Sequence, residues 1–461
     1  MIFIFFSFLV ILIITMFLLQ DAKPSILEPI GVSALLLLGI SGLVPFICRE
    51  FLNISYVYSS FEILTVVSVV ASFVAILSGS RRNKLNWHYK IERTDLLIIL
   101  FASLILIRGY LLPMRGWDAY SLYDSRALMF LSGTKLSQMV AFSKYDEFNQ
   151  LYYFSYPPMT SVLHTVMYAN SNTHVMLIYA IFYAVFMIFV YLFLRTMKLN
   201  KVIKFLLFVI SALNPLIFQH TKLAYTNLPN LSFQFVSLYY LVKFANSRKN
   251  SHLVISALLL AFSNWTRSLE PFFISFFVAF VLIVLIQKNT IINKIFQGVK
   301  YLFLSMTTWI IWHFYIMSTI GNLGATSPSI LEILSKVYDS FLLSNLLDVA
   351  FFIYNAYFPI ILYVLMAIFI FMIFLFRKKK TVKIEEKIIM TVILTIEALV
   401  FGGTLYFSTT FPWWNQIPDS LLRSNLILIP LIGVLSGYVL ESVQIKIQNV
   451  KKPVCKVTGT P

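Results

Sequence analysis

The residues DLLIILFASLILIRGYLL, at positions 95–112, decide the fold class of this chain. Their length and apolarity are typical of a helix that crosses a bilayer, which needs roughly 20 apolar residues. The next stretch, RGWDAYSLYDSRALMF at 115–130, places two aspartates, two arginines and several aromatic residues directly after that run. A plain connecting loop needs no such cluster, so its role depends on which side of the membrane it faces.

The composition of the whole chain indicates the same class. Of its 461 residues 59% are hydrophobic and only 12% are charged, and a soluble protein could not hide that much apolar surface from water. We therefore expect an all-α polytopic membrane protein with about 13 transmembrane helices. The apolar runs that predict them lie at 1–19, 31–48, 61–79, 95–112, 174–194, 202–219, 226–242, 251–263, 270–287, 298–318, 350–376, 387–407 and 422–440. The first run has no basic residue before it and no small-residue cleavage site after it, which favours a retained span over a signal peptide.

The distribution of Lys and Arg predicts the orientation. Of the 36 basic residues, 25 fall in six segments, at 81–93, 195–204, 243–249, 288–300, 377–387 and 446–456. Cytoplasmic loops retain Lys and Arg, so these segments are expected to face the cytoplasm, with the N-terminus outside. They form a solvated membrane-surface face, and no nucleic-acid motif interrupts them, so the net charge of +17 does not indicate a nucleic-acid partner.

The chain then divides into four parts. N-terminal transmembrane helices at 1–112 precede an external loop at 113–173, a transmembrane core follows at 174–440, and a cytoplasmic tail ends the chain at 441–461. The remaining outward loops lie at 220–225, 264–269, 319–349 and 408–421. Polar clusters from these distant segments would converge on one face of the bilayer, as the residues of a membrane-protein site do.

Acidic and aromatic residues of the first external loop are the leading candidates. Asp118 follows an apolar span, where a carboxylate is costly unless it is solvated, paired or used. Asp118 and Asp124 lie roughly 240° apart on an α-helix, so they are not expected to share a face or a metal ion. A surface ion pair with Arg126 is the simplest role for Asp124, and an aromatic belt is the simplest role for aromatic residues such as Trp117.

Basic residues are scarce on the outward side, so the few that occur there stand out. Arg267 and Arg423 lie at the outer mouths of separate spans, and Lys222 lies in a short outer loop. An Arg267–Glu270 ion pair is the simplest structural interpretation. A lipid phosphate is the functional one, because the planar fork of arginine donors suits phosphate oxygens.

The ordered set of outward motifs resembles a known superfamily. The motifs are WDAYSLYDSRALMF at 117–130, YPP at 156–158, AYTNLPNLSFQF at 224–235, WTRSLEPFF at 265–273 and Arg423 ahead of LILIP at 426–430. This order is similar to that of the GT-C membrane glycosyltransferases, which include protein O-mannosyltransferases and aminoarabinose transferases. Asn227 stands where relatives usually have Asp, and the spacing from Arg267 to Glu270 is one residue longer than the commonest pattern.

The resemblance implies a GT-C-like core, a catalytic first external loop and transfer of a sugar from a polyprenyl-phosphate donor to a glycan, lipid or protein acceptor. It implies Asp118 as the catalytic base, Arg267, Arg423 and Lys222 as donor-phosphate residues, and a set of substrate-binding residues. That set is Trp117, Tyr120, Asp124, Arg126, Tyr156, Asn227 and Glu270. No cofactor is implied, and a divalent metal stays compatible with the chemistry. The expected location is the plasma membrane of a prokaryote, with the active site extracytoplasmic.

Two other functional classes remain open, and a non-catalytic scaffold is a further alternative that would leave the charged residues on the outer face unexplained. A transporter or flippase of lipid-linked sugars would place its polar residues near the bilayer midplane and show internal repeats, whereas here the polar clusters lie at one interface. A glycan polymerase or ligase would be expected to carry larger outer loops rich in Arg and His, and the longest outer loop here is 113–173.

Overall fold

The chain folds into helices joined by short connections. The computed structural model describes residues 2–19, 25–56, 91–142, 154, 156–267, 272–287, 290–320, 330–339, 343–376, 382–410, 415, 421–423 and 425–451. The helices are α1 (Ile2–Leu18), α2 (Leu27–Leu52), α5 (Arg93–Leu111), η2 (Ala119–Asp124), α6 (Ser125–Leu131), α7 (Leu136–Phe142), α9 (Met159–Ala169), α10 (Met176–Thr196), α11 (Lys201–Ala212), α12 (Pro215–Gln219), η3 (His220–Lys222), α13 (Asn227–Ser247), α14 (Asn250–Thr266), α15 (Phe272–Ile286), α16 (Ile291–Ile320), α17 (Ile330–Asp339), α18 (Leu343–Tyr357), η4 (Phe358–Ile360), α19 (Ile361–Phe376), α20 (Ile384–Thr410) and α22 (Leu428–Lys451). Within these residues the only extended pairing is a single bridge, so the all-α prediction is confirmed.

The apolar runs of the sequence coincide with these helices. Twelve of the thirteen runs fall on described helices, and the remaining run, 61–79, lies outside the described residues. Five stretches of the described chain are long and apolar enough to cross a membrane, namely α2, α5, α10, Leu346–Phe374 across α18 and α19, and α20. The helices α11 and α12, bent by 47° at a short break, would add a sixth if they form one span. The membrane class is therefore supported, while the number of thirteen stays a prediction.

Helix α13 is a central helix that carries polar side chains. It is buried along nearly its whole length and carries polar side chains that neighbouring helices satisfy. The Ser263 hydroxyl donates to Asn230 Oδ1 at 2.6 Å, and the Ser237 hydroxyl donates to the Ser256 carbonyl at 2.8 Å. A central helix meets protein on all sides, so it can hold polar groups that lipid would penalise.

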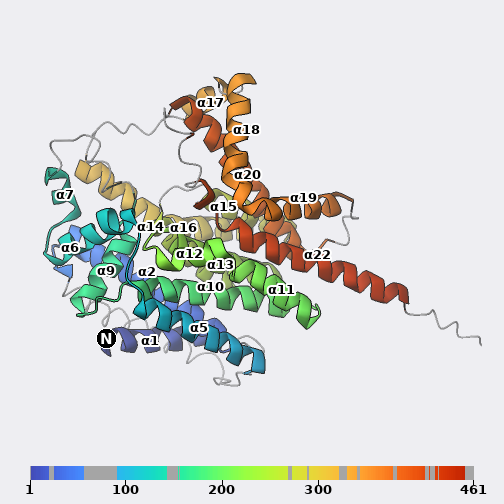
Figure 1. Ribbon diagram of the computed structural model, residues 1–461, viewed down its shortest axis with the longest axis horizontal. Helices are drawn as coiled ribbons and strands as arrows, with labels where there is room; N and C mark the ends of the chain where they lie inside the picture. Colours follow the sequence, from blue (N-terminus) through green and yellow to red (C-terminus); the bar gives the residue numbers. More distant parts are fainter. Residues whose placement is uncertain are drawn as a thin grey trace, which may run out of the picture.

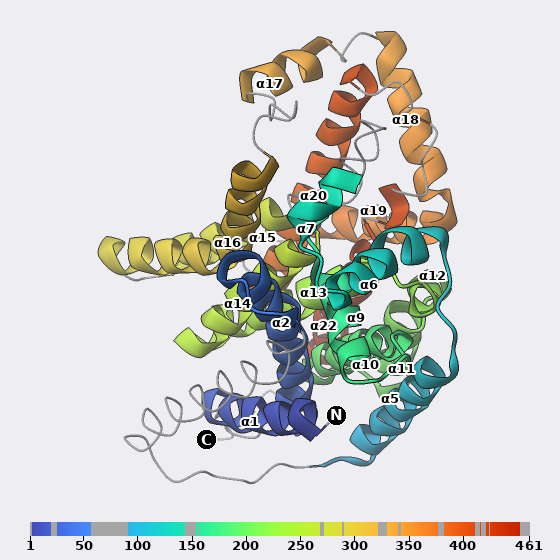
Figure 2. The same cartoon turned by 90° about the vertical axis from the view of Figure 1, so that its left-hand side faces the viewer.

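Figure 1 shows α10, α11, α13 and α22 side by side through the body of the molecule. Figures 1 and 2 both show α17 and α18 projecting from that body together with one end of α20. Helix α5 lies against α10 and presents most of its other side chains outward, since only 17% of its apolar window is buried. Exposed apolar side chains of this kind are expected on a helix surface that faces lipid.

Helices α10 and α13 run parallel, which fixes the two ends of the bundle. Near their starts Phe182 packs edge-to-face on Phe233, with centroids 5.2 Å apart. Farther along both helices Phe193 packs on Tyr239 in the same way, at 5.0 Å. The C-terminal ends of the two helices therefore lie at the same end of the bundle.

That end carries basic residues neutralised by acids from other helices. Arg195 of α10 contacts Asp95, at the start of α5, at 3.1 Å. Lys243 of α13 contacts Glu28, at the start of α2, at 2.7 Å. Two of the basic segments thus share one end, as an alternating topology requires. Helices α2 and α5 begin there and lead to the opposite end, where the 113–131 segment lies.

Candidate functional site

The chain that leaves α5 docks on the turn around η3. Arg108, in the last turn of α5, donates from Nη1 to the Thr221 hydroxyl at 2.6 Å, and its guanidinium lies 4.3 Å from the Phe218 ring centroid. Arg115 then forms the isolated parallel bridge with Leu223. These contacts bring the opening stretch of the first external loop against a segment more than a hundred residues away.

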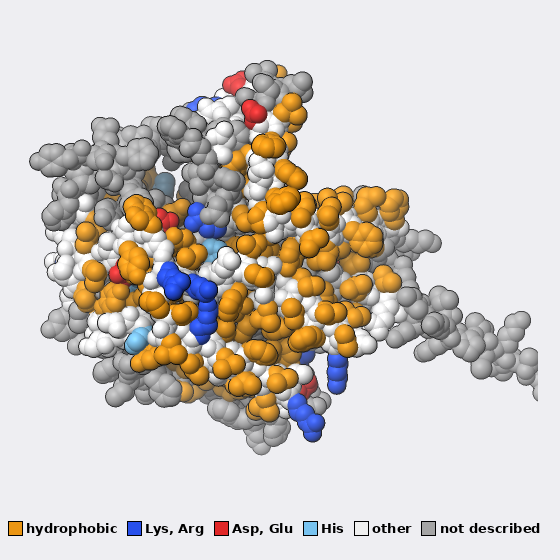
Figure 3. Space-filling view, viewed as in Figure 1, with side chains coloured by type: hydrophobic (Ala, Val, Ile, Leu, Met, Phe, Trp, Pro, Cys, Tyr) orange, Lys and Arg blue, Asp and Glu red, His pale blue; other side chains and the backbone are white. Residues whose placement is uncertain are grey.

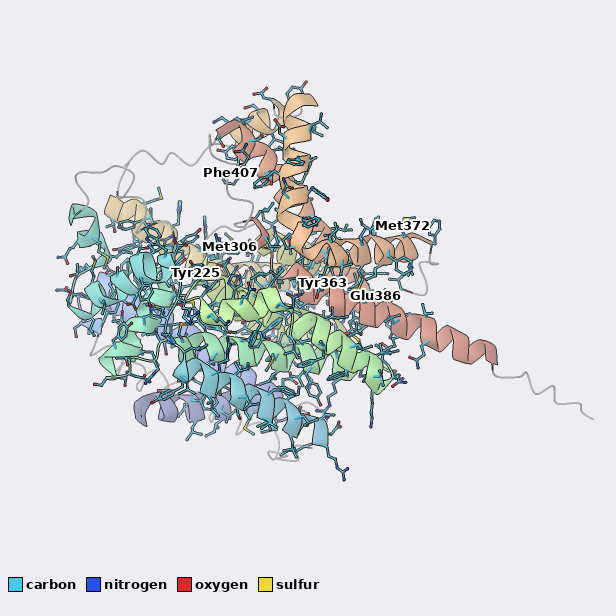
Figure 4. The ribbon with its side chains drawn as sticks, viewed as in Figure 1. Tyr225, Met306, Tyr363, Met372, Glu386 and Phe407 are labelled. Carbon is cyan, nitrogen blue, oxygen red and sulfur yellow. The ribbon has the colours of Figure 1, made fainter. Side chains whose placement is uncertain are left out.

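Gly116 makes that docking possible. Its φ is +106°, a backbone conformation that side chains disfavour, and a Cβ here would lie 2.8 Å from the Tyr225 hydroxyl. The glycine therefore turns the chain and lets Tyr225 approach the backbone two residues before Asp118. Tyr225, labelled in Figure 4, lies where the cyan elements of the first external loop approach the green helices.

Asp118 stands at the start of a π-turn. Residues Ala119–Asp124 form η2, which continues directly into α6. The Tyr120 hydroxyl donates to the Met114 carbonyl at 2.6 Å, and the Ser125 hydroxyl donates to the Tyr120 carbonyl at 2.7 Å. Asp118 is half-buried, whereas Trp117 and Tyr120 are 73% and 52% exposed. Single π-turns within α-helices frequently occur at functional sites.

The structure gives Asp124 different partners from the Arg126 ion pair that the sequence suggested. Its Oδ1 accepts from the hydroxyl of Tyr168 and contacts His164 Nδ1 at 3.2 Å. Because an ionised carboxylate is acceptor-only, the His164 proton belongs on Nδ1, and Nε2 then accepts from the Tyr179 hydroxyl at 3.0 Å. Burial alone would raise the pKa of Asp124, but the hydrogen bonds from His164 and Tyr168 outweigh it and hold the pKa below its ordinary value.

Arg126 is fully buried and holds the Tyr-Pro-Pro segment in place. Its Nε donates to the Ser161 hydroxyl at 3.0 Å, and its Nη1 donates to the Tyr156 carbonyl at 3.0 Å. The guanidinium also lies 5.7 Å from the Tyr123 ring centroid. Pro158 is the residue immediately before α9. Arg126 thus joins α6 to α9 and to the chain just before it.

Two further arginines stack on tyrosines of the same region. The Arg267 guanidinium lies 5.2 Å from the Tyr156 ring centroid, and that of Arg423 lies 5.7 Å from the Tyr225 ring centroid. Tyr123 links the two halves, because its ring is 6.3 Å from that of Tyr225. We name the set formed by these residues and Arg126 the cation–aromatic cluster; its members are Arg126, Arg267, Arg423, Tyr123, Tyr156 and Tyr225.

Residues around the cation–aromatic cluster complete its geometry. Asn227, which is 7% exposed, donates from Nδ2 to the Arg423 carbonyl at 3.1 Å and so holds the chain that carries this arginine. The buried imidazole of His220 lies within electrostatic reach of both Arg267 and Arg423. Lys222 is exposed on the same turn as His220, and Glu270 lies outside the described residues.

The electrostatic character of the region follows from these contacts. On the face drawn in Figure 3, Lys and Arg side chains gather beside a His side chain in a surface that is otherwise largely hydrophobic. Arg126 is buried among its own partners, so the guanidiniums of Arg267 and Arg423, each over a tyrosine ring, are the ones that suit an anion with an apolar or sugar part. Burial raises the pKa of Tyr123 to about 12, so its hydroxyl stays protonated, and it lies 3.4 Å from that of Thr226.

Sequence reasoning assigned no functional role to several residues of this region. Tyr168 and Tyr179 were not singled out, packing is the simplest role for a histidine such as His164, and Tyr123 and Tyr225 lie in the quoted motifs without an assigned role. In the structure His164, Tyr168 and Tyr179 form the network around Asp124, and Tyr123 and Tyr225 connect the arginines. No local pattern distinguishes these tyrosines from the others in a chain with 25 of them.

No family model matches this chain, and no curated protein or solved structure shows a significant match to it.

Proposed function

We propose that the chain is an integral membrane glycosyltransferase. It would transfer a sugar from a polyprenyl-phosphate donor to a glycan, lipid or protein acceptor on the extracytoplasmic face of a prokaryotic plasma membrane. The observation that carries the proposal is the cation–aromatic cluster. Its arginines come from three segments far apart in the chain, and each lies over a different tyrosine of one region. Tyr225 lies against Gly116, two residues before Asp118.

The chemistry assigns one role to each charged group. Asp118 takes the proton from the acceptor hydroxyl while that oxygen bonds to the anomeric carbon of the sugar. The bond from the anomeric carbon to the phosphate oxygen breaks, and its electron pair leaves with the lipid phosphate. Arg267 and Arg423 stabilise the charge that grows on this leaving group. Exposed Trp117 and Tyr120 offer flat faces on which sugar or prenyl groups can pack.

A transporter or flippase of lipid-linked sugars is the second candidate, and one observation favours it. Helices α11 and α12 form a pair bent by 47° at a break, which resembles the discontinuous helices of transporters. Against this candidate, the cluster lies at one end of the bundle with the loops, whereas transporters bind their substrates near the midplane.

Transfer from a panel of polyprenyl-phosphate sugars, in membranes containing matched amounts of each variant, tests the proposal. Asp118→Asn should keep the fold and lose about 10²–10⁴-fold in transfer. Arg267→Gln and Arg423→Gln should weaken donor use, whereas the Lys variants keep part of it because they retain the charge. Asp348→Asn, at an exposed position of α18, is the matched control and should leave transfer unchanged.

Near-wild-type transfer by Asp118→Asn would overturn the assignment of the base. Movement of an intact labelled lipid-linked sugar across vesicle membranes, without transfer and with dependence on Arg267 and Arg423, would favour the transporter instead.

A further inference from the structure

An apolar cavity lies on the side of α9 that faces away from the Asp124 network. Its volume is about 570 Å³, and its walls come from α1, α2, α5, α9 and α10. Nearly all the side chains that line it are aliphatic or aromatic, with Ser41, Ser103 and Asn172 as the few polar ones. A cavity with so few polar partners does not hold ordered water.

The lining of the cavity extends far enough along the helices for a hydrocarbon chain to lie against it. Its lining runs from Leu27 to Ser41 along α2, which is about 21 Å at 1.5 Å per residue. Along α10 it runs from Leu177 to Ile188, about 16 Å by the same rise.

The cavity is half-open rather than enclosed, so its apolar lining faces whatever surrounds the helices. For a helix bundle in a bilayer, the apolar material at hand is lipid. The outer end of the cavity is marked by Asn172, whose Oδ1 accepts from the His174 amide at 2.9 Å. The His174 ring in turn stacks on Tyr110 of α5. Polar and aromatic residues at that end suit the ester and headgroup region of a lipid.

Helix α9 separates the cavity from the proposed donor site. Leu163, Val166 and Met167 face the cavity. His164 and Thr165 turn the other way, towards the Asp124 carboxylate and the Ala127 carbonyl. A lipid whose phosphate is held in the cation–aromatic cluster would therefore have its chain on the far side of α9.

We propose that this cavity binds one acyl chain of a resident bilayer phospholipid, which enters at the Asn172 end and packs against α2, α5, α9 and α10. The inference is independent of the glycosyltransferase proposal, because the cavity lies apart from the cluster. It also gives α1 and α2 a role, since both contribute to the cavity wall. The acyl chain would pack against one side of α9, and the Asp124 network holds its other side.

Photo-crosslinking of the full-length protein tests the site. Nanodiscs of phosphatidylglycerol contain a small fraction of phosphatidylglycerol with a diazirine in its acyl chain, and labelled peptides are mapped by mass spectrometry. A second arm replaces the probe with a polyprenyl phosphate that carries a diazirine in its prenyl chain. We expect the acyl probe to label peptides of α2, α5 and α10 that line the cavity.

Filling variants and a matched control identify the cavity as the site of labelling. Ala102→Phe on α5 and Ala34→Phe on α2 add bulk inside the cavity and should each lower labelling about tenfold, which equals 1.4 kcal/mol of binding free energy. Leu104→Phe adds bulk on the outward face of α5, where the residue is 52% exposed, and should leave labelling unchanged. Two filling variants on different helices guard against misfolding of either one.

Release of bound lipid gives a second readout. In native mass spectra recorded from mild detergent, the wild type and Leu104→Phe should retain about one bound phospholipid. The filling variants should lose it. Labelling by the polyprenyl probe in place of the acyl probe would overturn the proposal. Equal labelling of wild type and both filling variants would overturn it as well.

Discussion

Substitution of His164 by Leu tests whether the buried network around Asp124 holds the π-turn. The leucine removes two hydrogen bonds from a fully buried position. The bond to the ionised Asp124 contributes about 1.5–3 kcal/mol, as charge-assisted bonds do. The buried Tyr179 hydroxyl then loses its acceptor, at a cost of about 1–3 kcal/mol. We therefore expect His164→Leu to lower the free energy of unfolding by about 3–5 kcal/mol.

The measurement is equilibrium unfolding of the purified protein in mixed micelles of dodecyl maltoside and sodium dodecyl sulfate. His174→Leu is the matched control, because it removes a partly exposed histidine that stacks on Tyr110, and its cost should be about 1 kcal/mol or less. Hydrogen exchange should also speed up in the segment 119–131 for His164→Leu but not for the control.

A double-mutant cycle with Asp124→Asn separates the network from simple packing. If His164 and Asp124 act together, the double variant should be more stable than the sum of the single effects predicts, by about 1–2 kcal/mol. Additive effects, within about 0.5 kcal/mol, would refute the reasoning that the histidine acts through this carboxylate.

Three further predictions concern other contacts. The folded-state pKa of Asp124 lies below the ordinary value of 3.8, so the contribution of the carboxylate to stability is present above that value and is lost as the pH falls through the lower folded pKa. In acid titrations the stability difference between wild type and Asp124→Asn should therefore shrink. A difference that does not change with pH would mean that the carboxylate is unpaired. Gly116→Ala should destabilise the protein by about 1–3 kcal/mol, because φ is positive and the new methyl meets the Tyr225 ring, and a Tm equal to that of wild type would contradict this close approach. A cysteine at exposed Ser132 should react with a membrane-impermeant reagent in intact cells while one at exposed Ser247 should not, and the reverse pattern would invert the topology.

Much of the candidate site could be predicted from residue type and position. Basic residues that stand alone on the basic-poor side of the chain singled out Arg267 and Arg423, and the structure brings both to tyrosines of one region. Arg126 was also selected, although its expected partner was wrong. The signal for Arg267 and Arg423 was a basic residue beside an apolar span, where charge is costly unless it is paired or used. Arg126 was selected through the resemblance to the GT-C motif order.

The sequence could not identify the partners of these residues. Asp124 lies two residues from Arg126, and proximity along the chain suggested an ion pair. The π-turn, however, directs the carboxylate to His164 and Tyr168 on α9, while the Arg126 guanidinium is directed to Ser161 and the Tyr156 carbonyl. Such choices depend on helix packing, which local sequence does not encode.

The sequence alone indicated a helical chain of the membrane class, because long apolar runs are costly to leave in water and are typical of helices that cross a bilayer. It also indicated where the helices lie, since twelve of the apolar runs coincide with them. Only the tertiary structure decided which helices occupy the centre, how α9 divides the Asp124 network from the apolar cavity, and which tyrosines join the three arginines. Those features arise from contacts between residues tens to hundreds of positions apart, and the packing of whole helices selects them.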